Sequence, residues 1–230
     1  MAFPSLPYIV LSVLWVALII YAVFGGADFG AGIWEVVATG TGAREQQGLI
    51  DDALGPVWET NHVWLIFLVV GLFSGFPNAF ATLVAVLFVP LTLALLGTVL
   101  RGSAFIFRTH GLRKLTSVWN RVFSLSSVMT PFFLGAAAAA VASGKIQTLG
   151  PKTQADLGHL WLTPFPVTIG VLSLALCATI AAIFLTVEAT DQKKTELALL
   201  FRKRGLRAGA VTAVLGALGL FEASSQAPIL

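Results

Sequence analysis

The sequence predicts an all-α protein: a polytopic transmembrane bundle of about six helices, forming one domain over residues 1–230. Composition is the first reason. Hydrophobic residues make up 57% of the chain and charged residues only 11%, too few to cover a water-soluble domain. The second is the mean hydropathy of +0.89. The third is that the basic residues gather at the ends of apolar runs, which indicates membrane topology and not nucleic-acid binding.

Apolar runs of about 20 residues define the expected spans. They cover residues 8–31, 57–75, 78–100, 119–142 and 164–187. A sixth run starts near residue 207 but soon meets Glu222, so we expect a short or incomplete span there. The N-terminus lacks the basic region of a cleaved signal peptide, and the first run is therefore expected to stay in the membrane.

The positions of lysine and arginine predict the orientation. Five of these residues lie in 101–121 and six in 193–207, and short loops rich in them face the cytoplasm. Counting spans from these loops places a loop at 40–55 in the cytoplasm as well. The N-terminus, the SGFPNAF connection and the loop at 143–160 are then expected outside.

Asp28 lies near the end of the first expected span, in FGGADFGAG. An ionisable residue at membrane depth is a candidate for function. Its glycine neighbours would let another helix or a bound group come close to the backbone. Two interpretations remain open, because Asp28 could cap a helix or pair with an arginine, or it could act directly in function.

Glu59 lies at the start of the second expected span, in GPVWETNHVWLIF, with Asn61 and His62 within one helical turn. The favourable helix dipole near an N-terminus would explain a carboxylate there. A proton pathway would explain it equally well, because partial desolvation makes proton uptake by a carboxylate easier and histidine titrates near neutral pH. The site residues predicted for this pathway are Glu59, Asp28, His62 and Asn61.

Trp58 and Trp64 flank this polar group, either as membrane-interface residues or as surfaces that stack on a ring. Arg101 and Arg108 are seven residues apart, so a continuous helix would place both on one face. We expect Arg108 to anchor the helix at the membrane surface. Arg101 is closer to the apolar run and is expected to pair with Asp28 or Glu59.

The chain has few histidine and cysteine side chains that could bind a metal ion or a haem iron. The single cysteine, Cys177, cannot form a disulfide or a cysteine cluster within the chain. The three histidines fall in separate parts of the sequence, at positions 62, 110 and 159. Haem ligation requires such donors to point into one place in a bundle. We therefore expect no metal site, and no haem bound by this chain alone.

Several segments together resemble subunit II of the cytochrome bd quinol oxidases. They are GADFGAG at 26–32, GPVWETNHVWL at 55–65, LFSGFPNAFA at 72–81, RGSAFIFR at 101–108, VWNRVFSLSS at 118–127 and the tract at 162–189. The resemblance implies a non-haem subunit of an oxidase that oxidises a membrane quinol and reduces dioxygen to water. It is identified as a short or truncated member, because the family usually has eight spans.

The same resemblance implies partners, cofactors and residue roles. The partner would be the haem-bearing subunit I, which carries haems b and d, together with a small single-span subunit. A structural quinone would be a further ligand, and the location would be a bacterial or archaeal cytoplasmic membrane. In the family, the acid matched by Glu59 is associated with proton delivery and the tryptophan matched by Trp64 with an oxygen route.

This chain also departs from the family pattern. Gly25 and Ile106 stand where acids are common, and Asn120 replaces an aspartate. The resemblance therefore places more of the proton access on Glu59. Two alternatives are kept: a proton-coupled membrane transporter that uses Asp28 and Glu59 in glycine-interrupted helices, and a purely structural membrane subunit.

Overall fold

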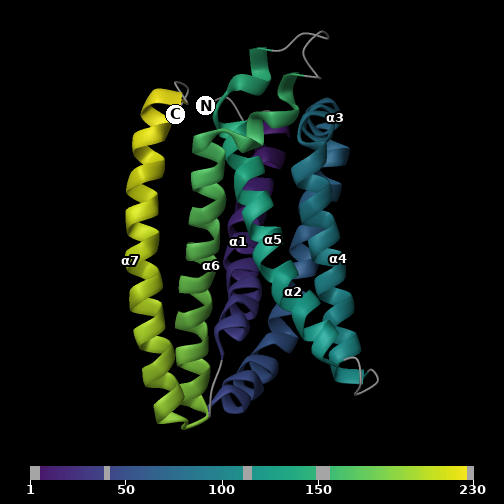
Figure 1. Cartoon of the computed structure of the whole chain (residues 1–230). Coiled ribbons are helices and arrows are strands. Elements are labelled where there is room, and N and C mark those ends of the chain that lie inside the picture. Colours follow the sequence, from purple (N-terminus) through teal and green to yellow (C-terminus); the bar gives the residue numbers. More distant parts are fainter. Residues whose placement is uncertain (1–5, 39–41, 111–115, 149–155, 227–230) are drawn as a thin grey trace, which may run out of the picture.

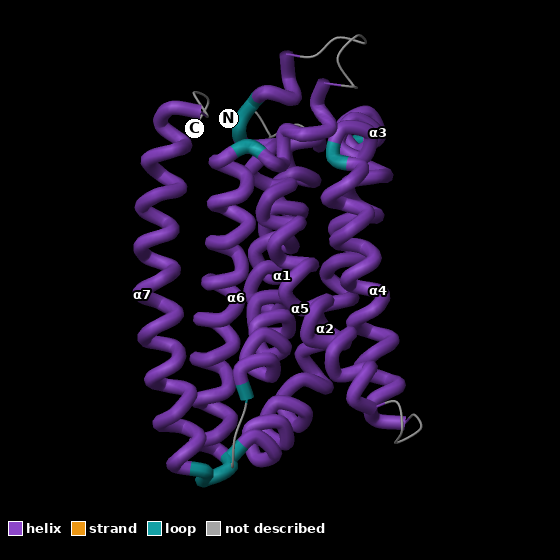
Figure 2. The backbone as a smooth tube through the Cα atoms, in the orientation of Figure 1, coloured by secondary structure: helices purple, strands orange, loops and turns teal. Residues whose placement is uncertain are grey.

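The computed structural model describes residues 6–38, 42–110, 116–148 and 156–226, and within them the chain is helical apart from short turns (Figure 2). The helices are α1 (Leu6–Val37), α2 (Ala43–Gly75), α3 (Pro77–Val86), α4 (Phe88–His110), α5 (Thr116–Ala142), α6 (Pro164–Asp191) and α7 (Thr195–Gln226), with 3-10 helices η2 (Lys145–Thr148) and η3 (Asp156–Leu162). All α-helices except α3 are long and apolar enough to cross a membrane. The predicted all-α bundle of about six spans is confirmed.

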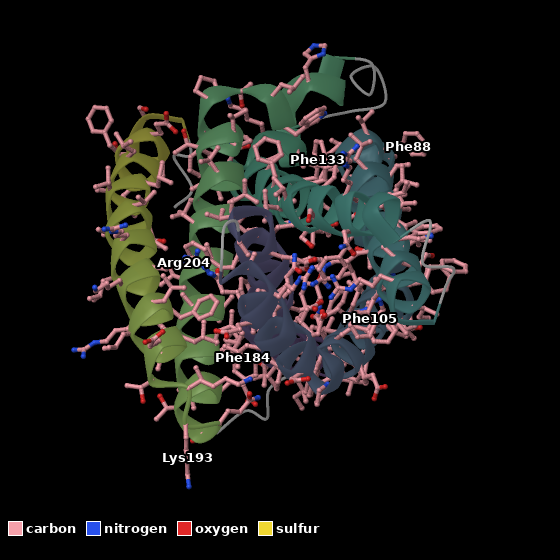
Figure 3. All side chains as sticks on the ribbon, turned by 60° about the horizontal axis from the view of Figure 1, so that its bottom comes forward. Phe88, Phe105, Phe133, Phe184, Lys193 and Arg204 are labelled. Carbon is pink, nitrogen blue, oxygen red and sulfur yellow. The ribbon has the colours of Figure 1, made fainter. Side chains whose placement is uncertain are left out.

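Helix α1 lies at the centre of the bundle and packs against α2, α5 and α6 (Figure 1). Helix α7 packs on α6 at one edge, and α4 packs on α5 at the other. Both labelled chain ends lie at the same end of the bundle as α3 (Figure 1). We call the opposite end, which holds Arg108, Arg121, Lys193 and Lys194, the basic end. Lys193 projects away from the bundle there (Figure 3).

The first span is longer than predicted, and Asp28 does not lie at its end. Helix α1 continues through the glycine-rich segment to Val37. Close packing against α6 explains why the glycines are there: a Cβ at Gly30 would lie 1.9 Å from the carbonyl oxygen of Cys177. In this segment the small residues bring two helices together without interrupting either one.

The loop predicted at 40–55 is wrong for most of its length, because α2 already begins at Ala43. Hydropathy does not detect this segment because it is amphipathic. Its buried face consists of Gln46, Leu49, Ile50, Ala53, Leu54 and Val57. Pro56 lies within the helix and lacks the N–H that would bond one turn back.

The third span was predicted at 78–100, but two helices occupy this region. Helix α3 ends at Val86 and α4 begins at Phe88. The cause is Pro90, which has no N–H to donate and whose ring would clash with the carbonyl group of Val86 in a continuous helix. The candidate span is therefore Phe88–Arg108.

The sixth span was predicted to start near residue 207 and to be short, and this too is wrong. Helix α7 begins at Thr195 and has 32 residues. Its first turns carry basic residues that lower the local hydropathy but are compatible with a helix. One of them, Arg204, donates a hydrogen bond from Nη1 to Gln46 Oε1 at 2.9 Å, and therefore ties α7 to the first turn of α2.

Candidate functional site

Asp28 of α1 and Arg101 of α4 form a deeply buried ion pair, with side chains 1% and 2% exposed. Arg101 Nη1 donates to Asp28 Oδ1 at 2.7 Å, and Nη2 donates to the main-chain carbonyl oxygen of Asp28 at 2.6 Å. Asn61 of α2 donates to the other carboxylate oxygen at 3.2 Å. Arg101 Nε donates to Ser127 Oγ of α5 at 2.9 Å. These four residues, the inner cluster, join four helices.

Two glycines of α1 make room for the inner cluster. A Cβ at Gly32 would lie 2.1 Å from Ser127 Oγ, and a Cβ at Gly25 would lie 3.3 Å from Asn61 Oδ1. The first distance is far below van der Waals contact, so an alanine at Gly32 would displace the partner of Arg101. The glycine-rich motif thus places the polar groups of α2 and α5 against α1.

A second ionic group lies nearer the basic end. Arg108 Nη1 of α4 donates to both carboxylate oxygens of Glu35 on α1, at 2.8 and 2.7 Å. Its Nη2 donates to Asp51 Oδ1 of α2. Arg108 and Glu35 are each 5% exposed, whereas Asp51 is 48% exposed. We call Glu35, Asp51 and Arg108 the outer cluster. The prediction that Arg108 is only a surface anchor is wrong, because it is a buried ionic residue.

The two clusters follow from matching sequence spacings. Asp28 and Glu35 are seven residues apart on α1, and Arg101 and Arg108 are seven residues apart on α4. The two helices run in the same direction, so each acid meets the arginine at the same level. The ring of Phe123 on α5 touches both guanidinium groups, with its centroid 4.4 Å from Arg101 Cζ and 4.1 Å from Arg108 Cζ.

Glu59 is not part of either cluster. It precedes Asn61 by two positions, and two residues turn a helix by about 200°, so the two side chains point to opposite sides of α2. Its carboxylate is exposed and, within the described part of the chain, makes no hydrogen bond or ion pair. It lies roughly four turns inside α2, so the explanation by the dipole of a helix N-terminus is wrong.

The other predicted residues of α2 divide between its two sides. Asn61 joins Asp28, as described above, whereas a ring nitrogen of His62 lies 3.2 Å from the carbonyl oxygen of Trp58. The ring of Trp58 stacks on Phe105 of α4 at 5.5 Å, and its buried indole nitrogen has no hydrogen-bond partner in the part of the chain that the structure describes. Trp64 contacts Phe67 edge to face at 6.1 Å. The structure therefore brings Asp28, Asn61 and Arg101 together and leaves Glu59, His62 and the tryptophans on other faces of α2.

Among the described side chains, the histidines do not converge on one place as a haem would require. His62 lies on Trp58 of its own helix, and His159 is exposed in η3. The side chain of His110 lies outside the described residues. No group of three or more His, Cys, Asp or Glu side chains in the described ranges could hold a metal ion.

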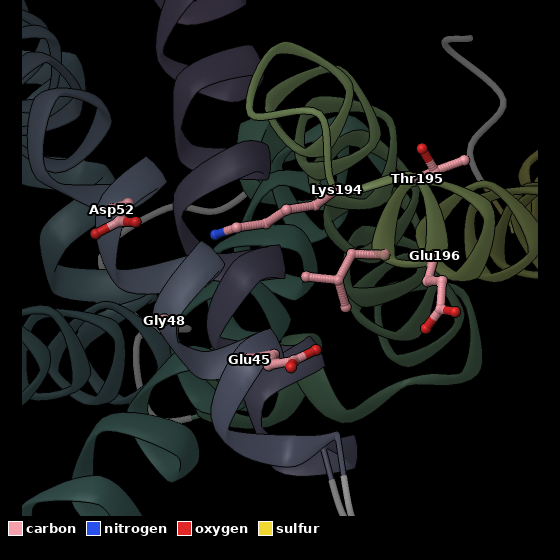
Figure 4. A pocket seen from close by; sticks show the side chains of 7 residues that line it. Glu45, Gly48, Asp52, Lys194, Thr195 and Glu196 are labelled. Atoms are coloured by element: carbon pink, nitrogen blue, oxygen red, sulfur yellow. The ribbon is translucent and has the colours of Figure 1, made fainter.

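Two cavities open at the basic end. One, of about 360 Å³, lies between the start of α2 and the α6–α7 connection, where Lys194 extends toward the side of Asp52, and Glu45 also lines the cavity (Figure 4). The other, of about 480 Å³, lies between α1, α2 and α5. Its lining includes Glu35, Gln47, Asn120, Arg121 and Ser124. The second cavity therefore reaches the outer cluster.

The outer cluster and Phe123 were missed from the sequence, although a signal was present. The heptad spacing of Arg101 and Arg108 predicts a shared face. The same spacing of Asp28 and Glu35 would have completed the pattern. The ion pairs that bridge α1 and α4 link the two pairs of residues, and spacing along the chain does not show which helices face each other.

The comparisons with known proteins agree on one family. A family model described as cytochrome bd terminal oxidase subunit II matches residues 6–227. Cytochrome bd ubiquinol oxidase subunit 2 of Bacillus subtilis (strain 168) is 36% identical over 113 residues, which are 48% of this chain and 32% of that protein. A second protein of that organism is 34% identical over 99 residues, covering 43% of this chain and 29% of its own length. The alignments thus cover about a third of the length of the curated relatives.

A solved structure extends the similarity to almost the whole chain. The structure of bd oxidase from Geobacillus thermodenitrificans contains a chain that superposes with a TM-score of 0.78 and 25% sequence identity. The match covers 97% of this chain and 68% of that chain. The resemblance drawn from the sequence motifs is confirmed: this chain belongs to the family of cytochrome bd terminal oxidase subunit II.

Proposed function

We propose that this chain is the non-haem subunit of a membrane quinol oxidase that reduces dioxygen to water. The observation that carries the proposal is Glu59 on the exposed face of α2, which pairs with no described residue, within a chain of this family. A carboxylate at membrane depth is expensive unless a polar partner or a water-filled path reaches it. Glu59 therefore indicates a partner subunit and a site where protons are handed over.

The surface around Glu59 supports a partner on this side of α2. One helical stripe continues from Glu59 through Val63, Ile66, Val70 and Phe73, whose side chains are 55% to 65% exposed. In a membrane, apolar residues can face lipid, but a charged residue on the same stripe needs a protein partner. We assign this stripe to the haem-bearing subunit I, in a heterodimer that also includes a small single-span subunit.

Proton access is assigned to Glu59 together with His62, which lie on neighbouring faces of the same turn. On the opposite side of α2, Asn61 donates a hydrogen bond to Asp28 of α1. A proton role for these two residues stays a prediction. Trp64 and Trp58 are proposed to border the oxygen route, since both lie on α2 within two turns of Glu59 and present aromatic surface to neighbouring rings. The complex would bind a membrane quinol in the cytoplasmic membrane of a bacterium or archaeon.

Haems b and d would be held by subunit I and would supply the redox chemistry. The residues of this chain would bind the partner, exclude water and move protons toward it. The structural quinone stays a prediction. The transporter alternative relied on glycine-interrupted helices, but α1 is continuous from Leu6 to Val37. The structure thus favours a subunit over a carrier.

The proposed function is tested by purifying the chain from its native membrane. We expect a larger haem-containing subunit to co-purify with quinol oxidase activity. Replacing Glu59 by Gln keeps the shape and removes the proton-accepting group, so turnover of the assembled complex should fall by about 10²-fold, a typical loss for a proton-transfer group.

The matched control is Glu188→Gln on α6, where the carboxylate already bonds Gln192 in its own helix. This variant should keep full turnover. A colourless chain with no partner would contradict the assignment to an oxidase. Full turnover of Glu59→Gln in an assembled complex would instead contradict the proton role and leave this chain as a scaffold.

A further inference from the structure

The outer cluster contains more negative than positive charge. Glu35 and Asp51 both bond Arg108, so two carboxylates share one guanidinium group. The inner cluster has one of each, Asp28 and Arg101. Arg108 and Glu35 are 5% exposed, and an uncompensated charge at such a site carries a desolvation penalty.

The neighbouring charged groups do not remove this excess. Arg101 on α4 is committed to Asp28, and the exposed Asp52 on α2 brings no positive charge. Arg121 on α5 lines the same cavity as Glu35, but it is exposed and makes no ion pair with Glu35. The balance of charge within the described residues therefore favours the uptake of one positive charge by the outer cluster.

Water can reach the outer cluster from the basic end. Asp51 is 48% exposed, and the 480 Å³ cavity between α1, α2 and α5 borders Glu35. In addition, Arg108 Nε is buried and has no hydrogen-bond partner among the described residues. An unpaired buried donor of this kind is normally satisfied by ordered water. Glu35 therefore has a route to the aqueous phase on one side and the buried Arg108 on the other.

We infer that Glu35, Asp51 and Arg108 form a proton-loading site that holds one dissociable proton shared by the two carboxyl groups. A proton from water in the cavity binds a carboxylate oxygen of Glu35 or Asp51, and the other carboxylate remains paired with Arg108. Release returns the same proton to water or passes it inward. Two acids this strongly linked titrate as a pair and not as separate residues. The inference rests on the proposed function, in which this subunit provides proton access.

The test is infrared spectroscopy of the affinity-purified chain with whatever subunits accompany it, titrated between about pH 6 and about pH 9, a range where isolated carboxyl groups are ionised. The wild-type protein should show the C=O band of a protonated carboxyl group. Both Glu35→Gln and Asp51→Asn should abolish this band, because either change leaves one carboxylate for one guanidinium. Asp52→Asn, at an exposed neighbouring position outside the cluster, should retain it.

Retention of the band in both cluster variants would overturn the inference. Loss in only one variant would assign the proton to that residue alone and would overturn the sharing. Asp51 is half exposed, so Asp51→Asn should assemble even where Glu35→Gln does not, and retention of the band in Asp51→Asn would then overturn the sharing. A failure of the proposed function would be seen separately: the same wild-type preparation would contain no haem and would have no quinol oxidase activity.

Discussion

At the scale of single residues, Asp28 and Glu59 have opposite surroundings although both are acids within membrane helices. Both carboxylate oxygens of Asp28 accept hydrogen bonds, from Arg101 and Asn61. Glu59 accepts none from any described residue. A fully paired, buried carboxylate holds helices together, whereas an unpaired one is available to a partner or a proton. The two residues should therefore respond differently to the same substitution.

Asp28→Asn should destabilise the assembled complex by about 3–5 kcal/mol, because it leaves Arg101 as an uncompensated buried charge. Glu59→Gln should leave the stability unchanged and lower the turnover. Thermal unfolding and quinol oxidase activity, measured on the same preparations, separate the two effects. An Asp28→Asn complex with wild-type stability and no activity would show that Asp28 carries protons and does not clamp the helices.

At the scale of elements, helix contacts in this bundle depend on where the glycines lie. Gly30 of α1 lies against the main chain of α6, and a Cβ there would meet the carbonyl oxygen of Cys177 at 1.9 Å. Gly48 of α2 is exposed, and a Cβ there would meet no atom within 4 Å. The two positions provide a matched pair, since both are glycines inside long helices.

Gly30→Ala should destabilise the chain by about 3 kcal/mol, because backbone atoms of α6 cannot move aside as a side chain would. Gly48→Ala should stabilise it by about 1 kcal/mol, since alanine has a higher helix propensity than glycine and its methyl group would meet no other atom here. Thermal unfolding of the purified protein measures both changes. Equal effects of the two substitutions would show that helix propensity dominates and that the α1–α6 contact is looser than the structure indicates.

The element scale also shows what the sequence can predict. All six spans were found because runs of about 20 apolar residues have few other uses. The predicted ends of the helices were wrong where hydropathy does not mark them. Residues 43–56 are largely polar outside one face, and they form a helix because that face is buried. Pro90 divides the next apolar run into two helices, although the hydropathy of that run is continuous. The outer cluster was missed because the predicted topology makes the first and third spans parallel but does not show that the acids of α1 face the arginines of α4.

At the scale of the whole molecule, the orientation in the membrane stays a prediction, and the fold shows which parts of the chain share each end of the bundle. The connection between α6 and α7, with Lys193 and Lys194, lies at one end of the bundle, and the end of α7 lies at the other (Figure 1). Short loops rich in lysine and arginine stay in the cytoplasm during insertion. The basic end, and with it the cavity at Glu35, is therefore expected to face the cytoplasm, where protons for dioxygen reduction would be taken up.

Cysteine labelling tests this orientation, because the one native cysteine, Cys177, is buried and should not react. Lys193 and Ser225 are exposed at opposite ends of the bundle. In intact spheroplasts, a membrane-impermeant maleimide should label Ser225→Cys and not Lys193→Cys. Permeabilisation should make Lys193→Cys reactive without changing the labelling of Ser225→Cys. The reverse pattern would place the outer cluster on the external side, where it could not load protons from the cytoplasm, so this labelling constrains the proton-loading site as well as the topology.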